Sequence, residues 1–262
     1  MTAFEKVFGK TKPVIGMVHL KPLPSSPDYG GDLEEIYRAA EADLRALIEG
    51  GATAVIIENF GDIPYAPHND LIACSAITSI ATRLRALTDM PMGINIQFND
   101  YEAEWAVAYA TGMDFIRVEC FAESRVGPNG EFAACGPALM RLKGRYPKDI
   151  ALLCDVQVKH TFPLVDQPVD FTIESIVEGG GDALICTGIT TGKSPDISDV
   201  EEMKRLAHGL PVIVGSGVNA RTVKDFMKVA DGAIIGSSFK KDGKVLNPID
   251  RDRVAELMSQ LD

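Results

Sequence analysis

Residues 212–237 read VIVGSGVNARTVKDFMKVADGAIIGS, and this stretch contains the features that decide the fold. Val212–Val214 and Ala233–Ile235 are short, β-branched-rich apolar runs, which are typical of strands buried on both faces. Arg221–Val229 between them has helical periodicity, and a glycine–serine loop follows each apolar run. The stretch therefore predicts a strand–loop–helix–strand unit with parallel strands.

The same unit recurs along the chain. The predicted strands are Val14–Leu20, Ala54–Ile57, Met92–Ile96, Phe115–Val118, Ala151–Val156, Ala183–Cys186, Val212–Val214 and Ala233–Ile235. The predicted helices are Leu33–Glu49, Leu71–Thr88, Tyr101–Ala110, Pro137–Arg145, Phe171–Glu178, Val200–His208, Arg221–Val229 and Arg251–Gln260. This alternation predicts a single (β/α)8 TIM barrel that occupies residues 1–262 as one domain, and a doubly wound open sheet is the alternative.

The composition restricts the partners of the chain. The chain contains 26 Lys and Arg residues and 37 Asp and Glu residues, which gives a formal net charge of −11 at pH 7. Because such a field repels phosphate polymers, we expect no nucleic acid as a partner. The longest apolar runs are strand-sized, so we expect no direct membrane insertion. The five cysteines form no CxxC pair, which favours reduced thiols in a cytoplasmic protein, and we also expect a homo-oligomer.

Loop lengths indicate which end of the barrel carries function. Links from a predicted strand to the next helix are long, such as residues 21–32 and 120–136. Links from a helix to the next strand are short, such as residues 50–51 and 89–91. In a TIM barrel the loops that follow the strands build the active face, so we expect the site there.

We expect a phosphate site at the ends of the last two strands. Gly215, Ser216 and Gly217 follow one strand, and Gly236 and Ser237 follow the other. Glycine lets the backbone approach an anion, and free N–H groups at a loop or helix start bind it. The loop after the sixth predicted strand adds Thr190, Thr191 and Gly192. Barrels commonly hold a substrate phosphate in such loops, so the predicted partner is a phosphorylated small molecule.

Polar side chains also stand at the ends of the first five predicted strands. The candidate catalytic residues are Glu58, Glu119, Asp155, Lys159 and His160. The candidate substrate-binding residues are His19, Asn95 and Arg117. Polar groups inside apolar strands are costly unless they face the barrel mouth or find partners. The alternative to substrate contact is a structural network in which Arg117 pairs with Glu119 or Glu58.

This cluster suits three kinds of chemistry. Neighbouring carboxylates raise one another's pKa, so Glu58, Glu119 and Asp155 suit general acid and base catalysis. Lys159 would form a Schiff base if it were desolvated. A histidine with the carboxylates would hold a divalent metal, but the chain has no spaced ligand motif such as HxH or HExxH. Acid and base chemistry is the preferred interpretation, and we expect no cofactor or metal.

Two loop segments have less specific interpretations. Residues 125–132 (RVGPNGEF) resemble a small hairpin with a Pro-Asn-Gly turn, which would be either a lid over the mouth or an oligomer contact. Lys240, Lys241 and Lys244 form a basic run that we interpret as a solvated loop rather than a polyanion site.

Several segments of the chain resemble the BtpA family. They are Ile15–Pro24 (IGMVHLKPLP), Glu58–Asp62 (ENFGD), Asp155–His160 (DVQVKH), Gly215–Val218 (GSGV) and Ala230–Ser237 (ADGAIIGS). The resemblance runs from about Lys12 to the C terminus and implies a TIM-barrel-like chain. The family name implies a peripheral role in the assembly or stability of photosystem I, although members also occur where there is no photosystem. Some relatives carry labels similar to phosphoribosylanthranilate isomerase, a class that uses a strand 1 cysteine, whereas this chain has Met17 and His19 there.

Two functions remain open from the sequence. The first is an enzyme of the isomerase or lyase type that acts on a small phosphorylated metabolite, such as a sugar phosphate, at the carboxyl ends of the strands. The second is a non-catalytic assembly or stability factor for a membrane complex such as photosystem I.

Overall fold

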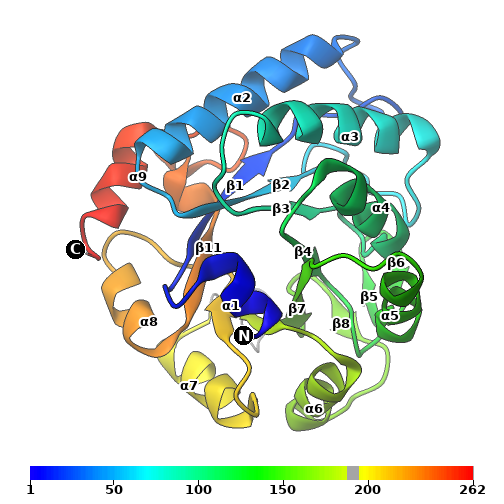
Figure 1. The fold of residues 1–262 in the computed structure, drawn as a ribbon, viewed down its shortest axis with the longest axis vertical. Helices are drawn as coiled ribbons and strands as arrows, with labels where there is room; N and C mark the ends of the chain where they lie inside the picture. The colour runs from blue at the N-terminus through cyan, green and yellow to red at the C-terminus, as the bar shows by residue number, and fades with distance from the viewer. Residues whose placement is uncertain (188–194, 262) are drawn as a thin grey trace.

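The computed structural model describes residues 1–187 and 195–261, and its centre is a closed barrel of parallel strands (Figure 1). The strands are β1 (Val14–His19), β2 (Ala54–Glu58), β3 (Met92–Asn95), β4 (Phe115–Val118), β7 (Ala151–Val156), β9 (Ala183–Cys186), β10 (Val212–Val214) and β11 (Gly232–Ile235). Around the barrel their order is β1-β11-β10-β9-β7-β4-β3-β2. Because β1 pairs with both β11 and β2, the predicted TIM barrel is confirmed and the open sheet is wrong.

A ring of helices covers the outside of the barrel. They are α2 (Leu33–Glu49), α3 (Leu71–Arg85), α4 (Tyr101–Thr111), α5 (Gly136–Arg145), α6 (Val169–Gly179), α7 (Ile197–Leu206), α8 (Val223–Val229) and α9 (Arg251–Met258). In five of these helices an aspartate carboxylate accepts a hydrogen bond from a first-turn N–H group: Asp32, Asp70, Asp100, Asp196 and Asp250. Such a cap is worth about 1 kcal/mol and fixes the place where the long loop ends.

Apolar side chains fill the barrel below its mouth. Ile15, Ile56 and Leu153 belong to one buried cluster with Phe115. The Phe115 ring packs against Gly93 on the neighbouring strand β3. A Cβ atom at Gly93 would lie 2.3 Å from this ring, so the absence of a side chain there makes room for it. The interior is therefore a packed core, and open space is left at the carboxyl ends of the strands.

A short helix that the sequence analysis did not predict closes the other end of the barrel. In α1 (Ala3–Phe8), Phe4 and Phe8 are buried, and the Phe8 ring lies 5.3 Å from that of Phe115, the first residue of β4. Figure 1 shows α1 over the centre of the barrel. The amino ends of the strands are thus covered.

A second, antiparallel sheet has the order β6-β5-β8. The predicted hairpin is confirmed as β5 (Arg125–Gly127) and β6 (Gly130–Phe132). The third strand, β8 (Phe162–Pro163), comes from the loop after β7 and was not predicted. Its pairing joins the loops that follow β4 and β7.

The lysine run after β11 differs from its prediction. Two short 3-10 helices follow the strand, η1 (Ser237–Phe239) and η2 (Lys241–Gly243). Lys240 between them is only 1% exposed, and its Nζ lies 2.7 Å from Oδ2 of Asp43 on α2. The interpretation as a solvated loop is wrong for Lys240 because its charge is buried and paired, whereas Lys241 and Lys244 are exposed.

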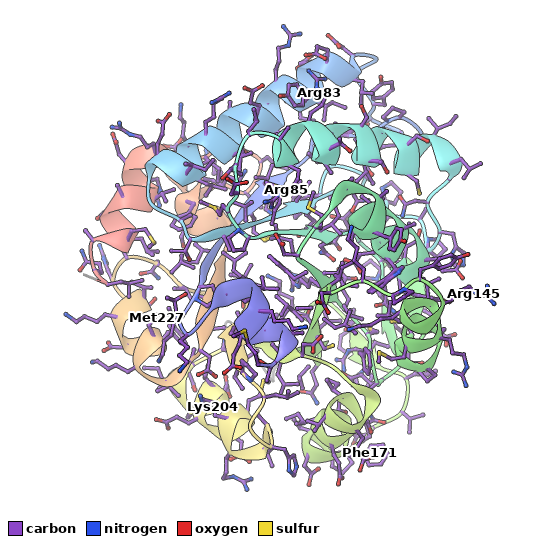
Figure 2. The ribbon with its side chains drawn as sticks, in the orientation of Figure 1. Arg83, Arg85, Arg145, Phe171, Lys204 and Met227 are labelled. Carbon is purple, nitrogen blue, oxygen red and sulfur yellow. The ribbon has the colours of Figure 1, made fainter. Side chains whose placement is uncertain are left out.

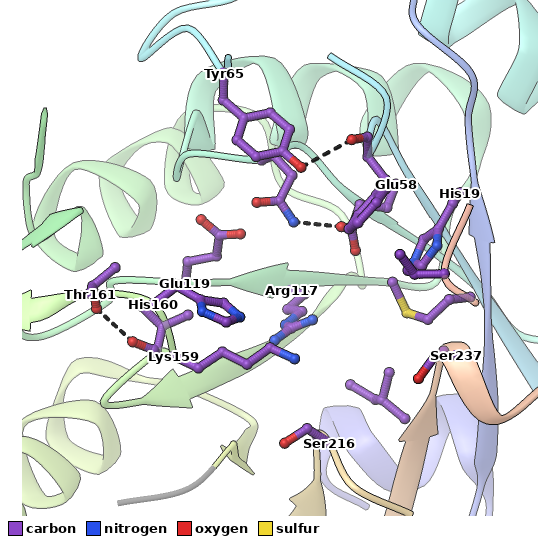
Figure 3. A pocket seen from close by; sticks show the side chains of 18 of the residues that line it. His19, Glu58, Tyr65, Arg117, Glu119, Lys159, His160, Thr161, Ser216 and Ser237 are labelled. Carbon is purple, nitrogen blue, oxygen red and sulfur yellow. Dashed lines mark hydrogen bonds between the residues drawn. The ribbon is translucent and has the colours of Figure 1, made fainter. Parts of the chain in front are cut away.

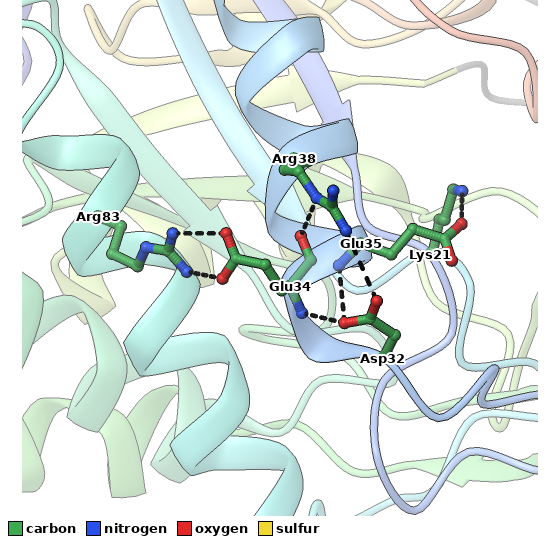
Figure 4. A network of polar contacts seen from close by, with 6 residues as sticks. All are labelled: Lys21, Asp32, Glu34, Glu35, Arg38 and Arg83. Carbon is green, nitrogen blue, oxygen red and sulfur yellow. Dashed lines mark hydrogen bonds and ion pairs between the residues drawn. The ribbon is translucent and has the colours of Figure 1, made fainter.

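The outer faces of the helices carry polar side chains, among them Arg145 and Lys204 (Figure 2). Figure 4 shows a network in which Glu34 on α2 accepts from both Nη atoms of Arg83 on α3, at 2.7 and 2.9 Å. Exposed pairs of this kind contribute little to stability. None of the helices in the described residues is long and apolar enough to cross a membrane.

Candidate active site

A cavity of about 710 Å³ opens at the carboxyl ends of the barrel strands (Figure 3). Most of the predicted site residues line it: His19, Glu58, Arg117, Glu119, Lys159, His160, Gly215, Ser216, Gly217, Gly236 and Ser237. They come from the ends of β1, β2 and β4 and from the loops after β7, β10 and β11. Parallel strands bring these distant parts of the sequence to one mouth.

The loops after β10 and β11 form one wall, which we call the anion cup (residues 215–218 and 236–238). Among the described residues, the main-chain N–H groups of Ser216, Gly217, Ser237 and Ser238 have no acceptor. The Ser238 hydroxyl donates to the carbonyl of Val218 at 2.6 Å and ties the two loops together. Ser237 is exposed at the cavity (Figure 3). The cup therefore presents free donors to an anion.

Glycine is required at two positions of the anion cup. Gly217 has a φ of 79°, a left-handed backbone that favours glycine. A Cβ at Gly215 would lie 2.5 Å from Cγ2 of Ile185 and 2.8 Å from that of Thr187. The Thr187 Oγ1 is buried and has no hydrogen-bond partner among the described residues. The loop after β10 thus lies tightly against β9.

The Glu119 carboxyl group is buried at the mouth, just beyond the end of β4. Burial is the main cause that raises its pKa to about 8; the charge of Arg117 opposes the rise, and the charges of Asp155 and Glu58 support it. Its Oε2 accepts a hydrogen bond from the N–H of Phe98 at 3.2 Å. At neutral pH most of this carboxyl group is protonated, so it can serve as a general acid.

Glu58 at the end of β2 is the second carboxyl group of the cavity, and it is also buried. Its Oε1 accepts a hydrogen bond from the side-chain amide of Gln97 at 2.5 Å (Figure 3). Gln97 is itself held because its N–H donates to Oδ1 of Asn59 at 2.8 Å. These contacts fix one oxygen of Glu58 and leave the other to receive a proton.

Arg117 and Asp155 form a buried ion pair at the base of the cavity. Nε and Nη2 of Arg117 lie 2.8 and 3.0 Å from the two carboxylate oxygens of Asp155. The prediction that Arg117 pairs with Glu119 or Glu58 is therefore wrong. Burial lowers the pKa of Arg117, but the charges of Asp155, Glu58 and Glu119 outweigh this effect and raise it. Asp155 does not line the cavity, which argues against its expected role as a proton carrier.

Lys159 lines the cavity from the loop after β7. Burial lowers the pKa of its amine and the charge of Arg117 adds to this, while Asp155 and Glu58 oppose it. No hydrogen bond or ion pair joins its Nζ to another described residue. Figure 3 shows the side chain extending into the open space between Glu119 and the anion cup. The neighbouring His160 is exposed, and burial and the Lys159 charge lower its pKa.

His19 ends β1 beside the anion cup, where its ring Cε1 would lie 3.7 Å from a Cβ at Gly236. Its ring stacks on Phe60, with centroids 4.4 Å apart. Burial lowers the pKa of His19, although the charge of Glu58 opposes the effect. The imidazole is thus held mainly neutral, and its Nδ1 is buried with no hydrogen-bond partner among the described residues.

Four predicted binding residues are not placed at the cavity. Asn95 is 1% exposed and does not line it. The Asn95 amide lies close enough to Glu119 to lower its pKa, but no well-formed hydrogen bond satisfies either of its polar atoms. Thr190, Thr191 and Gly192 lie outside the described residues, so their expected role stays a prediction.

The cavity also contains residues that the sequence analysis did not name as site residues. Many are apolar or aromatic and lie outside the barrel strands, among them Phe60, Tyr65, Phe98, Pro128, Asn129, Phe132, Val158 and Val245. The hairpin contributes Pro128, Asn129 and Phe132, so it lies over the mouth as the lid alternative expected. Phe98 has a φ of 76° and His160 a φ of 64°, which no sequence pattern had indicated. Strained non-glycine residues of this kind gather at functional sites.

No group of three or more His, Cys, Asp or Glu side chains in the described ranges is arranged to hold a metal ion. The five cysteines all lie in the described ranges and form no disulfide.

Comparisons with known proteins agree with this picture. Residues 10–262 match the BtpA family. The chain is 34% identical to the photosystem I biogenesis protein BtpA of Synechocystis, over 98% of this chain and 90% of that one. It is 37% identical to an uncharacterized protein of Pyrococcus horikoshii, over 94% of each chain.

Solved structures share the fold at low sequence identity. The tryptophan synthase alpha chain of Legionella pneumophila superposes with a TM-score of 0.63 at 13% identity and covers 100% of this chain and 98% of its own. The N-acetylmannosamine-6-phosphate 2-epimerase of Clostridium perfringens has a TM-score of 0.57 at 14% identity, with 99% and 96% covered. At these identities the likeness supports the fold alone.

Proposed function

We propose that this chain, which belongs to the BtpA family, is an enzyme of the isomerase or lyase type that acts on a small phosphorylated metabolite. One observation carries the proposal. A single cavity holds two buried carboxyl groups, Glu58 and Glu119, and the Lys159 amine, facing loops with N–H donors; within residues 1–187 and 195–261 neither the amine nor these donors have a partner. Such a combination of an acid, a base and an anion cup is what proton transfer on a phosphorylated substrate requires.

The anion cup is the proposed phosphate site. Its support comes from the four N–H groups without an acceptor and the exposed hydroxyl of Ser237. Barrels commonly hold a substrate phosphate in the loops after their last two strands. The names of two structural relatives, the 6-phosphate epimerase and a thiamine phosphate pyrophosphorylase of Pyrococcus furiosus, also refer to phosphorylated compounds.

The proposed reaction begins with proton removal next to a carbonyl. Glu58 takes the proton from the carbon, and protonated Glu119 gives a proton to the carbonyl oxygen, which yields an enediol. Lys159 stabilises the negative charge that develops on the oxygen. Loss of the proton from the other hydroxyl of the enediol and addition of a proton to the original carbonyl carbon complete an isomerisation. In a lyase, Glu58 instead takes the proton from a hydroxyl on the second carbon from the carbonyl. The carbon–carbon bond between that carbon and the first then breaks, one fragment leaves as a carbonyl compound, and the bonding electrons pass into an enol whose oxygen Glu119 protonates.

Lys159 offers a second covalent route. A desolvated amine attacks a carbonyl to form a Schiff base with loss of water. Reduction with borohydride in the presence of a ligand would trap this adduct in the unmodified protein and not in Lys159→Ala. A protein mass unchanged after reduction with every ligand that binds would exclude the route.

Phosphate binding is tested by thermal shift with inorganic phosphate and a panel of sugar phosphates. We expect saturating ligand to raise the melting temperature by several degrees, since binding at about 100 times Kd adds about 2.7 kcal/mol. Ser237→Asp places a carboxylate in the cup and should abolish the rise. Thr82→Asp adds the same charge on the exposed face of α3 and should retain it. No rise with any phosphorylated compound would overturn the proposal.

An assembly factor is the second candidate function, favoured by the Synechocystis relative's name and by an exposed apolar patch. The patch consists of Val126, Phe162, Leu164 and Val165 on β5, β8 and the loop that follows, with Val165 71% exposed. A strain that lacks this protein should lose photosystem I or a comparable membrane complex. If the role is non-catalytic, expression of Glu58→Gln in that strain would restore the complex. Restoration by Glu58→Gln would therefore favour this function over the enzyme.

We also propose that the chain is a cytoplasmic homo-oligomer. The five cysteines form no disulfide, which suits a reducing compartment, and the apolar patch of β5 and β8 offers a surface for self-association. Sedimentation of the unmodified protein and of Leu164→Ser tests this, and a monomer in both would contradict it.

A further inference from the structure

A group of aromatic side chains lies across the mouth from the anion cup. Tyr65, Phe98 and Phe132 line the cavity together with Val158, and we call this group the ring pocket. Phe98 follows β3, and Phe132 belongs to the hairpin after β4. In the barrel order, β3 stands four strands away from β10, and β4 stands four strands away from β11. The two pairs of strands therefore lie on opposite sides of the barrel.

The ring pocket is built rather than incidental. The rings of Phe98 and Phe132 lie 3.8 Å apart between centroids, and both are almost completely buried. Phe98 is held there by a left-handed backbone with a φ of 76°, which is costly for a bulky side chain. The same turn aims the Phe98 N–H at Glu119. One strained turn therefore sets both the apolar wall and the proposed acid.

Tyr65 forms the upper part of this wall. Its hydroxyl donates to the carbonyl of Phe60 at 3.0 Å, so the phenol is anchored at its polar end (Figure 3). Burial raises its pKa, and the charges of Glu58, Glu119 and Asp62 add to this, which keeps the phenol neutral. The ring is half-buried and presents apolar surface to the cavity.

The proposed proton-transfer groups lie between the anion cup and the ring pocket or at the edge of the ring pocket. Glu58 ends β2 and Lys159 follows β7, strands that stand between the side of the anion cup and the side of the ring pocket. Glu119 follows β4, at the edge of the ring pocket, where it accepts from the Phe98 N–H. The cavity of about 710 Å³ is in the range of pockets that enclose drug-sized ligands. A phosphate and a short sugar chain would fill the cup and the polar centre and leave the ring pocket empty.

We propose that the substrate is a phosphate monoester that also carries a flat, unsaturated ring, with its phosphate in the anion cup and its ring against Phe98, Phe132 and Tyr65. This inference rests on the proposed function and specifies its substrate class. Aromatic side chains bind flat rings by offset or edge contacts that add to the burial of apolar area. The carbons between phosphate and ring would then lie over Glu58, Glu119 and Lys159.

Calorimetric titration with two matched pairs of compounds tests the inference. The first pair is ribose 5-phosphate and adenosine 5′-monophosphate, and the second is butyl phosphate and 4-phenylbutyl phosphate. Inorganic phosphate is the reference for the anion cup alone. We expect the ring-bearing member of at least one pair to bind at least tenfold more tightly than its partner. Equal or weaker binding of the ring-bearing member in both pairs would overturn the inference.

Variants separate the ring pocket from general stability. Phe98→Leu and Phe132→Leu keep apolar volume but remove the rings, so each should weaken the ring-bearing ligand roughly fivefold or more, while inorganic phosphate binds as before. Phe4→Leu makes the same change in α1 at the opposite end of the barrel and should alter neither affinity. If the two site variants affect only the melting temperature, the rings are structural and the inference is wrong.

The two proposals fail in different ways. If no phosphorylated compound binds, including inorganic phosphate, the phosphate-enzyme proposal itself is wrong. If the sugar phosphates bind and Ser237→Asp abolishes their binding, but rings add no affinity, the proposed function stands and only the substrate class is overturned.

Discussion

At the scale of single residues, Glu119 contributes most to the proposed chemistry. It lies with Glu58 and Asp155 in a buried environment, where the charge of Arg117 opposes theirs. Burial favours the neutral acid, so a carboxyl group that would be ionised in water keeps its proton near pH 7. The pKa near 8 thus suits Glu119 to the role of acid that we propose.

The raised pKa of Glu119 predicts a pH dependence of stability. Its folded-state pKa of about 8 lies above the unfolded value, so its contribution to stability is full below about pH 4.5 and is lost as pH rises through about 8. Between pH 4.5 and pH 8.5, the free energy of unfolding of Glu119→Gln should therefore rise relative to that of the unmodified protein by at least about 1 kcal/mol. Urea unfolding at both pH values measures this. Glu201→Gln, an exposed control, should show no such change, and equal behaviour of the two variants would contradict the assignment.

The Arg117–Asp155 pair predicts a large effect of removing one partner. Asp155→Ala leaves a buried guanidinium without its bidentate carboxylate and should lower the free energy of unfolding by about 3 kcal/mol or more. Glu202→Ala removes the partner of Arg205 in an exposed pair and should cost far less. Urea denaturation compares the two, and similar small losses in both would show that the buried pair is not structural.

Predictions for single residues were right where the end of one strand fixes the position of a side chain. They were wrong where the pairing between neighbouring strands fixes its partner. The ends of β1, β2 and β4 placed His19, Glu58 and Glu119 at the mouth as expected. The partner of Arg117 depends on the register between β4 and β7, which the pattern within one strand does not contain. That is why Asp155, and not Glu119 or Glu58, pairs with Arg117.

At the scale of elements, apolar periodicity identified the barrel strands to within one or two residues. It failed for short or irregular elements. β8 is two residues long and contains Pro163, so no alternation marks it. For α1 a signal existed, because Thr2 and Glu5 form a capping box. The aromatic wall was missed because Tyr65 and Phe98 lie in loops whose conformation the sequence does not reveal.

The hairpin of β5 and β6 depends on one buried arginine. Nη1 of Arg125 lies 2.8 Å from Oε2 of Glu123, and its Nη2 donates to the carbonyl of Thr161 at 3.2 Å. Arg125→Met would leave Glu123 unpaired and untie the loops after β4 and β7. We expect amide hydrogen exchange in residues 125–132 to accelerate about tenfold, with little change in the barrel strands. Unchanged protection of the hairpin would contradict this role.

At the scale of the whole molecule, a net charge of −11 coexists with the anion site that we propose. The global field excludes polyanions, whereas the local N–H donors of the anion cup act over short range. The barrel order places the anion cup and the ring pocket on opposite sides, with Glu58 and Lys159 between them. The sequence predicted the barrel and the glycine–serine loops of the cup. The placement of the cup and the ring pocket on opposite sides of the mouth could be seen only in the closed barrel.

The central claim is that Glu58 and Glu119 transfer protons on a bound phosphorylated substrate. Nuclear magnetic resonance in D2O measures it directly, with every phosphorylated carbonyl compound that stabilises the protein. We predict deuterium uptake at the carbon next to the carbonyl group with the unmodified protein, and at least about 100-fold slower uptake with Glu58→Gln, since general base catalysis contributes roughly 10² to 10⁴ in rate. If these compounds bind in the cavity but none exchanges hydrogen, or if Glu58→Gln exchanges it as fast, the account is contradicted.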